Sequence, residues 1–284
     1  MSIYISRIQN IATQNNLNLI EVKQLFGGDI NEVFLLKCKE GDFVVKLNDA
    51  TKFPKMFTAE TKGLNYLRDS NSFKIPKVLA NGEIENTSYL LLQYISNGEL
   101  NAGFWESFAD NLAKLHQVTQ TDFGLDHDNY IGSLPQKNNF SKSASEFYIS
   151  NRLEPQFNTA SENGFQFKKL ASFYKTISKI IPNEAPSLIH GDLWSGNYMV
   201  SKKSQAVLID PAVAFAPREM DIAMMELFGG FSEELIINYN SIFPLEKGWE
   251  DRVSLWQLYY LLVHLNLFGS SYLPKVKSII NKYS

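Results

Sequence analysis

The chain has almost no cysteine, and this limits how it can be stabilised. Cys38 is the only cysteine among its 284 residues. A disulfide within the chain is therefore excluded, and so is a zinc site built from several cysteines. Such cysteine usage is typical of a reducing compartment, so we expect a cytoplasmic protein.

The sequence also lacks a large charge of either sign. It contains 27 Lys and Arg against 30 Asp and Glu, which gives a formal net charge of −3. Without a basic excess we expect no nucleic acid partner. An apolar content of 44%, with 20 Phe and 13 Tyr, excludes a disordered chain and indicates a sizeable core. This length predicts one large domain or two coupled domains.

Long hydrophobic runs are missing as well. The N-terminal stretch "MSIYISRIQNIATQNNLNLI" lacks the continuous apolar core of a signal peptide. The most apolar stretch, residues 255–268, is interrupted by Gln257, His264 and Asn266. It is too short and too polar to cross a bilayer. We therefore expect a buried helix there and no membrane association.

The first third of the chain is dominated by short apolar runs separated by turns. Residues 3–15 have loose helical spacing, and short strand-like runs begin at Ile20. Between two of these runs, Glu40-Gly41-Asp42 predicts a hairpin turn. Residues 54–70 predict a helix that starts at Pro54, and "SYLLLQYIS" (88–96) predicts a continuous apolar strand.

The rest of the chain has helical periodicity. In "FWESFADNLAKLHQV", the residues Phe104, Phe108, Leu112 and Leu115 share one helical face. Four further helices are predicted at residues 141–157, 165–181, 219–240 and 250–268. We therefore expect an α+β fold with two parts: a small antiparallel sheet with one helix in residues 1–95, and a larger, mainly helical part in residues 96–284. Ligand clefts commonly form at such a junction.

One motif carries the chemistry. "HGDLWSGN" (190–197) fits the His-x-Asp-x-x-x-x-Asn pattern of a kinase catalytic loop. In that pattern Asp192 is the catalytic base that accepts the proton of the acceptor hydroxyl, and Asn197 is a metal ligand. Asp210 follows the apolar strand "AVLI" and is expected to return beside Asn197 as the second ligand. Such oxygen ligands suit Mg²⁺.

Two alternatives to this assignment of the catalytic and metal-binding residues were considered. An Asp-x-x-x-x-Asn pair alone is typical of a polar turn, but His190, Asp192, Asn197 and Asp210 together favour a phosphotransferase. The literal kinase triplet Asp122-Phe123-Gly124 lies before the loop, whereas in kinases the metal-binding Asp comes after it. We therefore predict that this triplet is a structural turn.

The sheet part is expected to bind ATP. Lys46 in "FVVKL" resembles the kinase strand lysine that contacts the α and β phosphates, and strand alternation predicts that it shares a face with Val44. Glu60 in the following helix is the expected ion-pair partner of Lys46. An exposed strand lysine and an exposed helix glutamate are the simpler alternatives.

Two further ATP contacts are predicted in the same part. Gly27 and Gly28 lie where a glycine-rich loop would cover the phosphates, although a hairpin turn explains them equally well. Gln93, Tyr94 and Ile95 are expected to form the hinge that binds adenine through backbone groups. An ordinary core strand is compatible with that role.

The sequence resembles the fructosamine kinase (ketosamine 3-kinase, protein-ribulosamine 3-kinase) family. The resemblance rests on "HGDLWSGN" with its Trp194, and on the block "IDPAVAFAPREMDIAMMELFGGF" (209–231). It extends over most of the chain through "GGDINE", "MFTAE", "DNYIGSLPQ" (128–136), "NRLEPQ" (151–156) and "LWQLYYLLVHLNLFGSSYLP" (255–274). Aminoglycoside and choline kinases share the catalytic loop and metal ligands, but neither this Trp nor the long block.

The resemblance implies a fold, an activity and partners. The fold is the two-lobed protein-kinase-like fold, with residues 1–95 as the nucleotide-binding N-lobe and 96–284 as the C-lobe with the catalytic loop and substrate site. The activity is ATP- and Mg²⁺-dependent phosphorylation of the sugar 3-hydroxyl of ketosamines, either small molecules or glycated protein lysines. Because the 3-phosphate is unstable and detaches, the activity is one of deglycation.

The resemblance also implies roles for particular residues. Trp194 lies against the sugar, and Asn129 and Tyr130 belong to the substrate side. His190 is a scaffold of the loop, while Arg218, Glu219 and Asp221 brace the segment that follows Asp210. Position 29 is Asp where many relatives have a cysteine. That difference puts a disulfide-linked dimer in doubt and favours a monomer.

Two rival functions are weighed. An aminoglycoside or choline phosphotransferase shares the catalytic motif, but residues 252–284 contain no Asp or Glu to bind a polycation. Choline would bind in an aromatic cage, and although the chain has many Tyr and Trp residues, the sequence does not show where such a cage would lie. A catalytically dead, kinase-like regulatory protein is disfavoured because all four catalytic positions are filled.

Overall fold

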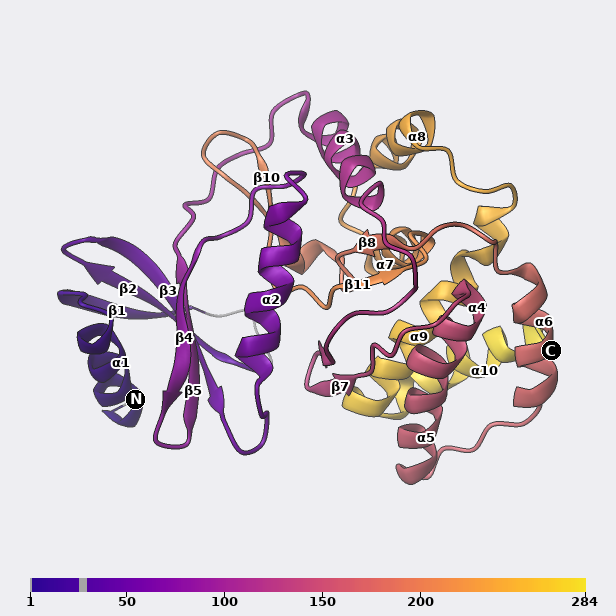
Figure 1. Cartoon of the computed structure of the whole chain (residues 1–284), viewed down its shortest axis with the longest axis horizontal. Helices are drawn as coiled ribbons and strands as arrows, with labels where there is room; N and C mark the ends of the chain where they lie inside the picture. The colour runs from indigo at the N-terminus through magenta and orange to yellow at the C-terminus, as the bar shows by residue number, and fades with distance from the viewer. Residues whose placement is uncertain (1, 26–29) are drawn as a thin grey trace.

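A five-stranded antiparallel sheet forms most of the N-terminal part of the chain, with strand order β1-β2-β3-β5-β4. The computed structural model describes residues 2–25 and 30–284 (Figure 1). The strands are β1 (Leu19–Leu25), β2 (Glu32–Cys38), β3 (Gly41–Asp49), β4 (Val78–Ile84) and β5 (Thr87–Gln93). The predicted hairpin turn is confirmed, since β2 pairs with β3 and Cys38 lies opposite Gly41.

The two faces of the sheet are covered by different helices. Helix α1 (Ser2–Gln14) packs Ile8 and Ile11 against one face, together with Val45 and Leu47 of β3. Helix α2 (Met56–Asp69) packs on the opposite face, which it shares with Val44 of the same strand. Strand alternation was therefore predicted correctly, and α1 is a second helix in addition to the one expected. Figure 1 shows α2 between the sheet and the helical part of the chain.

The remaining chain is mainly helical, as predicted. Its helices are α3 (Phe104–His116), α4 (Ala144–Phe147), a π-helical turn (Tyr148–Leu153), α5 (Glu154–Glu162), α6 (Leu170–Ile180), α7 (Glu219–Phe228), α8 (Glu233–Ile242), α9 (Trp249–Phe268), a 3₁₀ turn (Ser270–Tyr272) and α10 (Leu273–Lys282). Helix α9 is buried along most of its length, because the core packs around it on several sides. One apolar cluster spans both parts of the molecule, since it contains Leu64 of α2, Leu90 of β5 and Phe108 of α3.

Three short antiparallel ladders carry the loops of the helical part. They are β6 (Asn129–Ile131) with β7 (Leu134–Gln136), β8 (Ser187–Ile189) with β11 (Ala214–Ala216), and β9 (Tyr198–Val200) with β10 (Ala206–Leu208). The chain enters the helical part after β5, and a lobe boundary at residue 95 stays a prediction.

Four of the predicted helices have different bounds. The helix expected at 141–157 is made of α4, the π-helical turn and α5 and ends at Glu162, and the helix expected at 165–181 begins at Leu170. The helix expected at 219–240 is broken into α7 and α8 at Gly229-Gly230, both of which have positive φ. A Cβ on Gly230 would lie 2.5 Å from the Cβ of Ser195, so glycine allows this turn to touch the catalytic loop. Helix α2 begins at Met56 rather than at Pro54, because Lys55 adopts a left-handed conformation before it.

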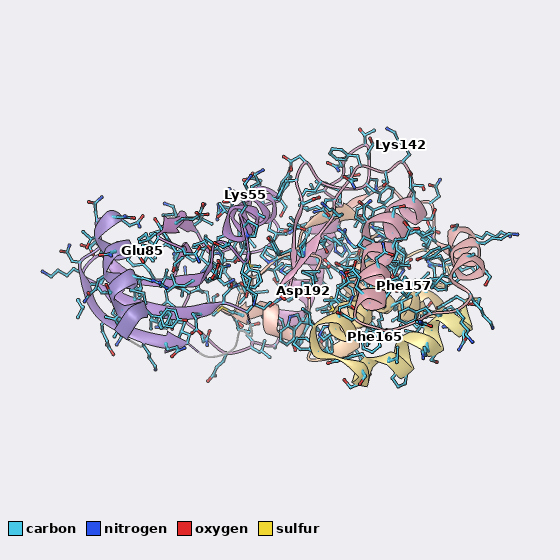
Figure 2. All side chains as sticks on the ribbon, turned by 90° about the horizontal axis from the view of Figure 1, so that it is seen from below. Lys55, Glu85, Lys142, Phe157, Phe165 and Asp192 are labelled. Atoms are coloured by element: carbon cyan, nitrogen blue, oxygen red, sulfur yellow. The ribbon has the colours of Figure 1, made fainter. Side chains whose placement is uncertain are left out.

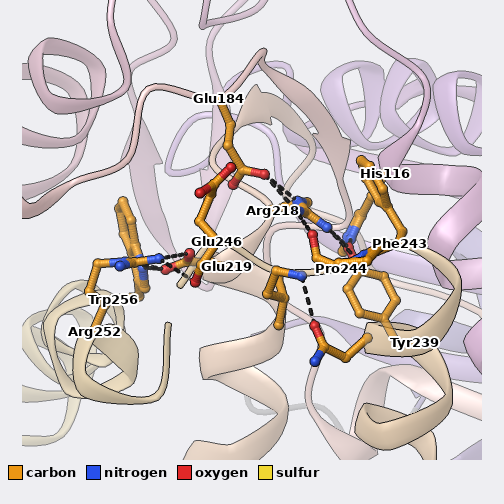
Figure 3. A network of polar contacts seen from close by, with 12 residues as sticks. His116, Glu184, Arg218, Glu219, Tyr239, Phe243, Pro244, Glu246, Arg252 and Trp256 are labelled. Carbon is orange, nitrogen blue, oxygen red and sulfur yellow. Dashed lines mark hydrogen bonds and ion pairs between the residues drawn. The ribbon is translucent and has the colours of Figure 1, made fainter. Parts of the chain in front are cut away.

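Buried ion pairs brace the start of α7 (Figure 3). Glu219 accepts two hydrogen bonds from Arg252, at 2.9 and 2.5 Å, and one from the Trp256 indole at 2.7 Å. Arg218 donates to Glu184 and to the carbonyls of Phe243 and Pro244. The bracing role predicted for Arg218 and Glu219 is thus confirmed, and it joins α7 to α9.

We predict that Arg252→Met lowers the free energy of unfolding by about 3 kcal/mol or more, because it leaves the Glu219 carboxylate buried without its cation. Urea unfolding followed by circular dichroism measures the loss. The matched control is Lys142→Met, which removes an ion pair to Asp122 whose lysine side chain is 81% exposed. That change should stay within about 0.5 kcal/mol. Equal losses in the two variants would contradict the prediction.

Candidate active site

The catalytic loop runs between β8 and β9 and depends on a close backbone contact. The amide of Ala212 donates to the carbonyl of His190 at 2.9 Å, next to the β8–β11 ladder. Gly191 has a φ of +81°, and a Cβ at this position would lie 2.1 Å from the carbonyl oxygen of Ala212. Only glycine fits this position, which explains the glycine before Asp192 in the motif.

Asp221 holds the same loop through its backbone. Its carboxylate is fully buried and accepts the N–H groups of His190 at 2.7 Å and Gly191 at 2.9 Å. His116 lies 3.3 Å from the same carboxylate. Two backbone donors therefore orient the peptide just before Asp192. Asp221 was predicted to brace the segment after Asp210, but its carboxylate binds the catalytic loop instead.

His190 is a scaffold residue, as predicted. Its ring is fully buried, with Nε2 3.0 Å from the carbonyl of Ile209. Its Nδ1 accepts the N–H of Asp192 at 3.3 Å. Burial lowers the pKa of His190, so the ring is neutral and donates through Nε2. Both contacts hold the loop to the strand that leads to Asp210.

Asp192 lies between the sheet and the helical part, where Figure 2 labels it. The side-chain amide of Asn197 donates to its carboxylate at 3.0 Å and to its backbone carbonyl at 2.8 Å. Burial raises the pKa of Asp192 to about 7, against the opposing effect of the Asn197 hydrogen bond. A carboxylate with a pKa near 7 is well matched to accept a proton at neutral pH.

Lys46 joins the sheet part to the catalytic segment. Its Nζ lies 2.7 Å from Glu60 of α2 and also contacts the carboxylate of Asp210. The Lys46 side chain is 6% exposed. Burial opposes its charge, but Asp210 and Glu60 outweigh that effect and raise the pKa of Lys46. The ion pair with Glu60 predicted from the sequence is therefore present.

The β9–β10 hairpin brings Asn197 and Asp210 together. Asn197 directly precedes β9, Asp210 follows β10, and the N–H of Ile209 donates to the carbonyl of Asn197 at 3.0 Å. Asp210 has a φ of +54°, an uncommon backbone conformation for a residue other than glycine. No group of three or more His, Cys, Asp or Glu that could hold a metal occurs in the described part of the chain. The side-chain oxygens of Asn197 and Asp210 are nevertheless of the type that suits Mg²⁺, which takes its other ligands from phosphate and water.

A single cavity of about 500 Å³ collects most of the predicted site residues. Those that line it are Lys46, Glu60, Asn129, Tyr130, Asp192, Trp194, Asn197 and Asp210. They come from β3, α2, β6 and the loops around β9 and β10, so the site lies at the junction of the two parts.

Trp194 forms part of an aromatic wall of this cavity. Trp194 is 37% exposed, so it is not a core residue. The indole packs edge-on against Phe228 at 6.4 Å between ring centres and lies over Gly196, where a Cβ would approach it to 2.3 Å. His264, Phe268 and Tyr272 continue the wall.

Asn129 and Tyr130 line the cavity but also make structural contacts. The Asn129 amide donates to the carbonyl of Val213 at 2.9 Å and accepts from Gln136 at 2.7 Å. Tyr130 donates to the carbonyl of Pro54 at 3.0 Å. These bonds hold the segment after Asp210 and the approach to α2, and a direct contact of either residue with substrate stays a prediction.

The structure does not bring every predicted residue to the cavity. Gln93, Tyr94 and Ile95 are absent from its lining, and the N–H groups of Gln93 and Tyr94 donate to the carbonyls of Lys77 and Asp42. Their adenine-binding role stays a prediction. Gly27, Gly28 and Asp29 lie outside the described residues.

The Asp122-Phe123-Gly124 triplet is structural, as predicted. Phe123 and Ser141 exchange two backbone hydrogen bonds of 2.9 Å, and Gly124 pairs with Phe215. The carboxylate of Asp122 binds Lys142 at 2.9 Å. These contacts fix a turn, and none of the three residues lines the cavity.

Sequence reasoning missed several residues of the cavity wall. They are Ile30, Asn31, Met56, Met224, Phe228, Tyr260, Val263, His264, Leu267, Phe268 and Tyr272. Most of them lie on α7 and α9, whose apolar character indicated only core packing. The polar residues within that apolar pattern, Tyr260 and His264, were the one available signal.

A comparison with known families decides between the kinases that share this motif. The family model described as fructosamine kinase matches residues 1–284, the whole chain.

The chain belongs to the fructosamine kinase family.

Relatives in this family cover nearly the full chain. A probable ketoamine kinase of Enterococcus faecium is 39% identical over 97% of this chain and 99% of its own length. The chloroplastic protein-ribulosamine 3-kinase of Arabidopsis thaliana is 32% identical over 93% of this chain and 83% of its own. With the catalytic motif complete, membership in this family makes the chain a kinase, for which ATP is a substrate.

Solved structures agree with the family. A putative fructosamine-3-kinase of Haemophilus somnus superposes with a TM-score of 0.88 at 29% identity, covering 97% of this chain and 95% of its own. The aminoglycoside phosphotransferase APH(4)-Ia superposes with a TM-score of 0.61 at 16% identity, with 99% of both chains covered. The second likeness concerns the fold alone, and it confirms the predicted protein-kinase-like architecture.

None of the helices among residues 2–25 and 30–284 is long and apolar enough to cross a membrane. The apolar stretch at 255–268 is part of α9, a largely buried helix, as its length and polarity predicted.

We predict that Gly191→Ala strongly destabilises the protein, because its new Cβ overlaps the carbonyl of Ala212 in addition to the strain of a positive φ. The control is Gly164→Ala, where φ is +87° and no atom lies within 4 Å of the added Cβ. The control should lose only about 1–2 kcal/mol, the cost of the left-handed backbone. Urea unfolding of both variants measures the free energy of unfolding that each loses, and the difference between the two losses is the cost of the steric overlap. Equal losses would contradict the prediction.

Proposed function

We propose that the chain is an ATP-dependent ketosamine kinase that phosphorylates the sugar 3-hydroxyl of fructosamine or ribulosamine adducts, with Mg²⁺ as cofactor. Because the chain belongs to the fructosamine kinase family, one structural observation is the main support for this proposal. Asp192, Asn197, Asp210 and Lys46 converge in one cavity, and the exposed indole of Trp194 lies beside them.

In the proposed reaction Asp192 removes the proton of the acceptor hydroxyl. The hydroxyl oxygen bonds to the γ-phosphorus of ATP, the bond from that phosphorus to the β–γ bridging oxygen breaks, and ADP leaves. The proton ends on the Asp192 carboxylate, whose pKa of about 7 suits both accepting and releasing it. The hydrogen bond from Asn197 orients the carboxylate for this transfer.

Lys46 and Asp210 exchange partners when ATP binds. Lys46 turns from Asp210 toward the α and β phosphates while Glu60 keeps hold of it. Asn197 and Asp210 would then hold Mg²⁺, which would neutralise phosphate charge. Gly27 and Gly28 are proposed to cover the phosphates, and Gln93, Tyr94 and Ile95 to bind adenine.

The substrate side of the cavity fits a sugar joined to an amine better than a polycation. The only Asp and Glu side chains in the described lining are Glu60, Asp192 and Asp210, and each already has a phosphoryl-transfer role. A polycationic aminoglycoside would need additional carboxylates. The wall of Trp194, Phe228 and Phe268 instead offers stacking surface to the sugar and its amine. Because Trp194 is partly exposed, a glycated protein lysine reaches the cavity from the surface.

The function is tested by ADP release from Mg²⁺-ATP with a panel of fructosamine, ribulosamine, an aminoglycoside and choline. We expect turnover with a ketosamine and appearance of the sugar 3-phosphate by ³¹P NMR. Turnover with another member of the panel and none with either ketosamine would refute the proposal.

A second prediction tests the catalytic base. Asp192→Asn keeps the shape of the side chain but cannot accept the proton, so kcat should fall about 10²–10⁴-fold while ATP still binds. The matched control is Asp122→Asn, in the triplet that imitates a kinase metal motif, and it should keep normal turnover. Near-normal turnover of Asp192→Asn in the ADP-release assay would show that Asp192 is not the catalytic base.

A further inference from the structure

One buried hydroxyl beside the base has no protein partner. Tyr260 of α9 is 1% exposed, and its hydroxyl makes no hydrogen bond to any residue in 2–25 or 30–284. Other buried tyrosines are satisfied: Tyr148 donates to the carbonyl of Leu255 at 2.6 Å, and Tyr259 to Gln136 at 2.5 Å. Because a buried hydroxyl without a partner destabilises the fold, Tyr260 requires an explanation.

The position of Tyr260 supplies that explanation. It lines the cavity together with Asp192 and Trp194. It belongs to a buried apolar cluster that includes Met224 and Val263, so a phenylalanine would fill this position equally well. Packing therefore accounts for the ring but not for the hydroxyl.

The neighbouring carboxylates do not use the hydroxyl. Asp221 already accepts two backbone N–H groups, and Asp192 accepts the amide of Asn197. Burial, together with the charges of Asp221 and Asp192, raises the pKa of Tyr260 well above its ordinary value. The phenol therefore keeps its proton and remains a hydrogen-bond donor in a residue that lines the cavity.

We propose that the Tyr260 hydroxyl is a substrate-recognition group that donates a hydrogen bond to an oxygen of the ketosamine sugar held at Asp192. This role rests on the ketosamine kinase activity proposed above. It makes Tyr260 a determinant of specificity, because a site built to hydrogen-bond a substrate oxygen discriminates against compounds that lack it. In this proposal the Trp194 indole stacks on the sugar, whereas the Tyr260 hydroxyl donates a hydrogen bond to one sugar oxygen.

The test is Tyr260→Phe, which removes only the hydroxyl. We expect kcat/KM for the ketosamine to fall about 10- to 100-fold, the cost of leaving a substrate oxygen without its donor. The affinity for ATP should not change. The midpoint of urea unfolding should stay the same or rise, because the hydroxyl has no partner to lose.

The matched control is Tyr148→Phe, which removes a satisfied hydroxyl in the core. It should lower the midpoint of urea unfolding while kcat/KM stays within about twofold of the original chain. If Tyr260→Phe behaves like this control, with lost stability and unchanged kcat/KM, the hydroxyl has a structural role and the proposal is wrong.

A substrate series identifies the contact. Ketosamines that each lack one sugar hydroxyl, other than the reacting one, are assayed with the original chain and with Tyr260→Phe. We expect one missing oxygen to reduce kcat/KM in the original chain but not in the variant, as a double-mutant cycle requires for a direct contact. If every analogue loses the same factor in both proteins, Tyr260 binds no substrate oxygen. If the original chain phosphorylates no ketosamine at all, the proposed function fails and Tyr260's role fails with it.

Discussion

The buried ammonium group of Lys46 is the interaction on which the site depends. It contacts carboxylates from α2 and from the segment after β10, while its own backbone belongs to the central strand of the sheet. A charge this deeply buried is tolerated only when it is paired, so the three segments must keep their relative positions. The sheet, α2 and the catalytic segment are thereby joined at the point where phosphates are proposed to bind.

A second buried charge, the carboxylate of Asp221, organises the loop that carries the proposed base. It binds the peptide groups before Asp192, and the start of its helix is held to α9 through Glu219, Arg252 and Trp256 (Figure 3). Helix α9 therefore supports the catalytic loop through α7, and it also contributes Tyr260 to the lining of the cavity. Asp192 and the α9 part of the cavity wall are therefore linked through one set of buried contacts.

The chemistry of the site was predictable because its spacing is local. The segment from Asp192 to Asp210 is a loop followed by one hairpin, so the positions of Asn197 and Asp210 follow from strand pairing. The pairing of Lys46 with Glu60 was predictable for a similar reason, since α2 follows directly after β3 in the chain. The same spacing rules identified the Asp122 triplet as a turn.

Other features depend on contacts between distant segments. The break between α7 and α8 exists because Gly230 touches Ser195, and helical periodicity alone could not reveal that approach. The structural use of the Asn129 amide depends on Val213 and Gln136. In both cases the contacting residue is remote in sequence, and no local sequence pattern predicts that the two residues are close in space.

The sequence by itself determined the α+β architecture and the pairing of the strand lysine with its glutamate, and it identified the proposed base and the proposed metal ligands. Each of these follows from periodicity or short-range spacing. Only the tertiary structure decided that Trp194 is exposed beside Asp192, that α7 and α9 line the cavity, and that the hydroxyl of Tyr260 has no partner among residues 2–25 and 30–284. The physical reason is that exposure and hydrogen-bond satisfaction depend on every segment that packs around a side chain. Periodicity predicted α9 as a buried helix, but it could not predict which of its polar groups would find partners.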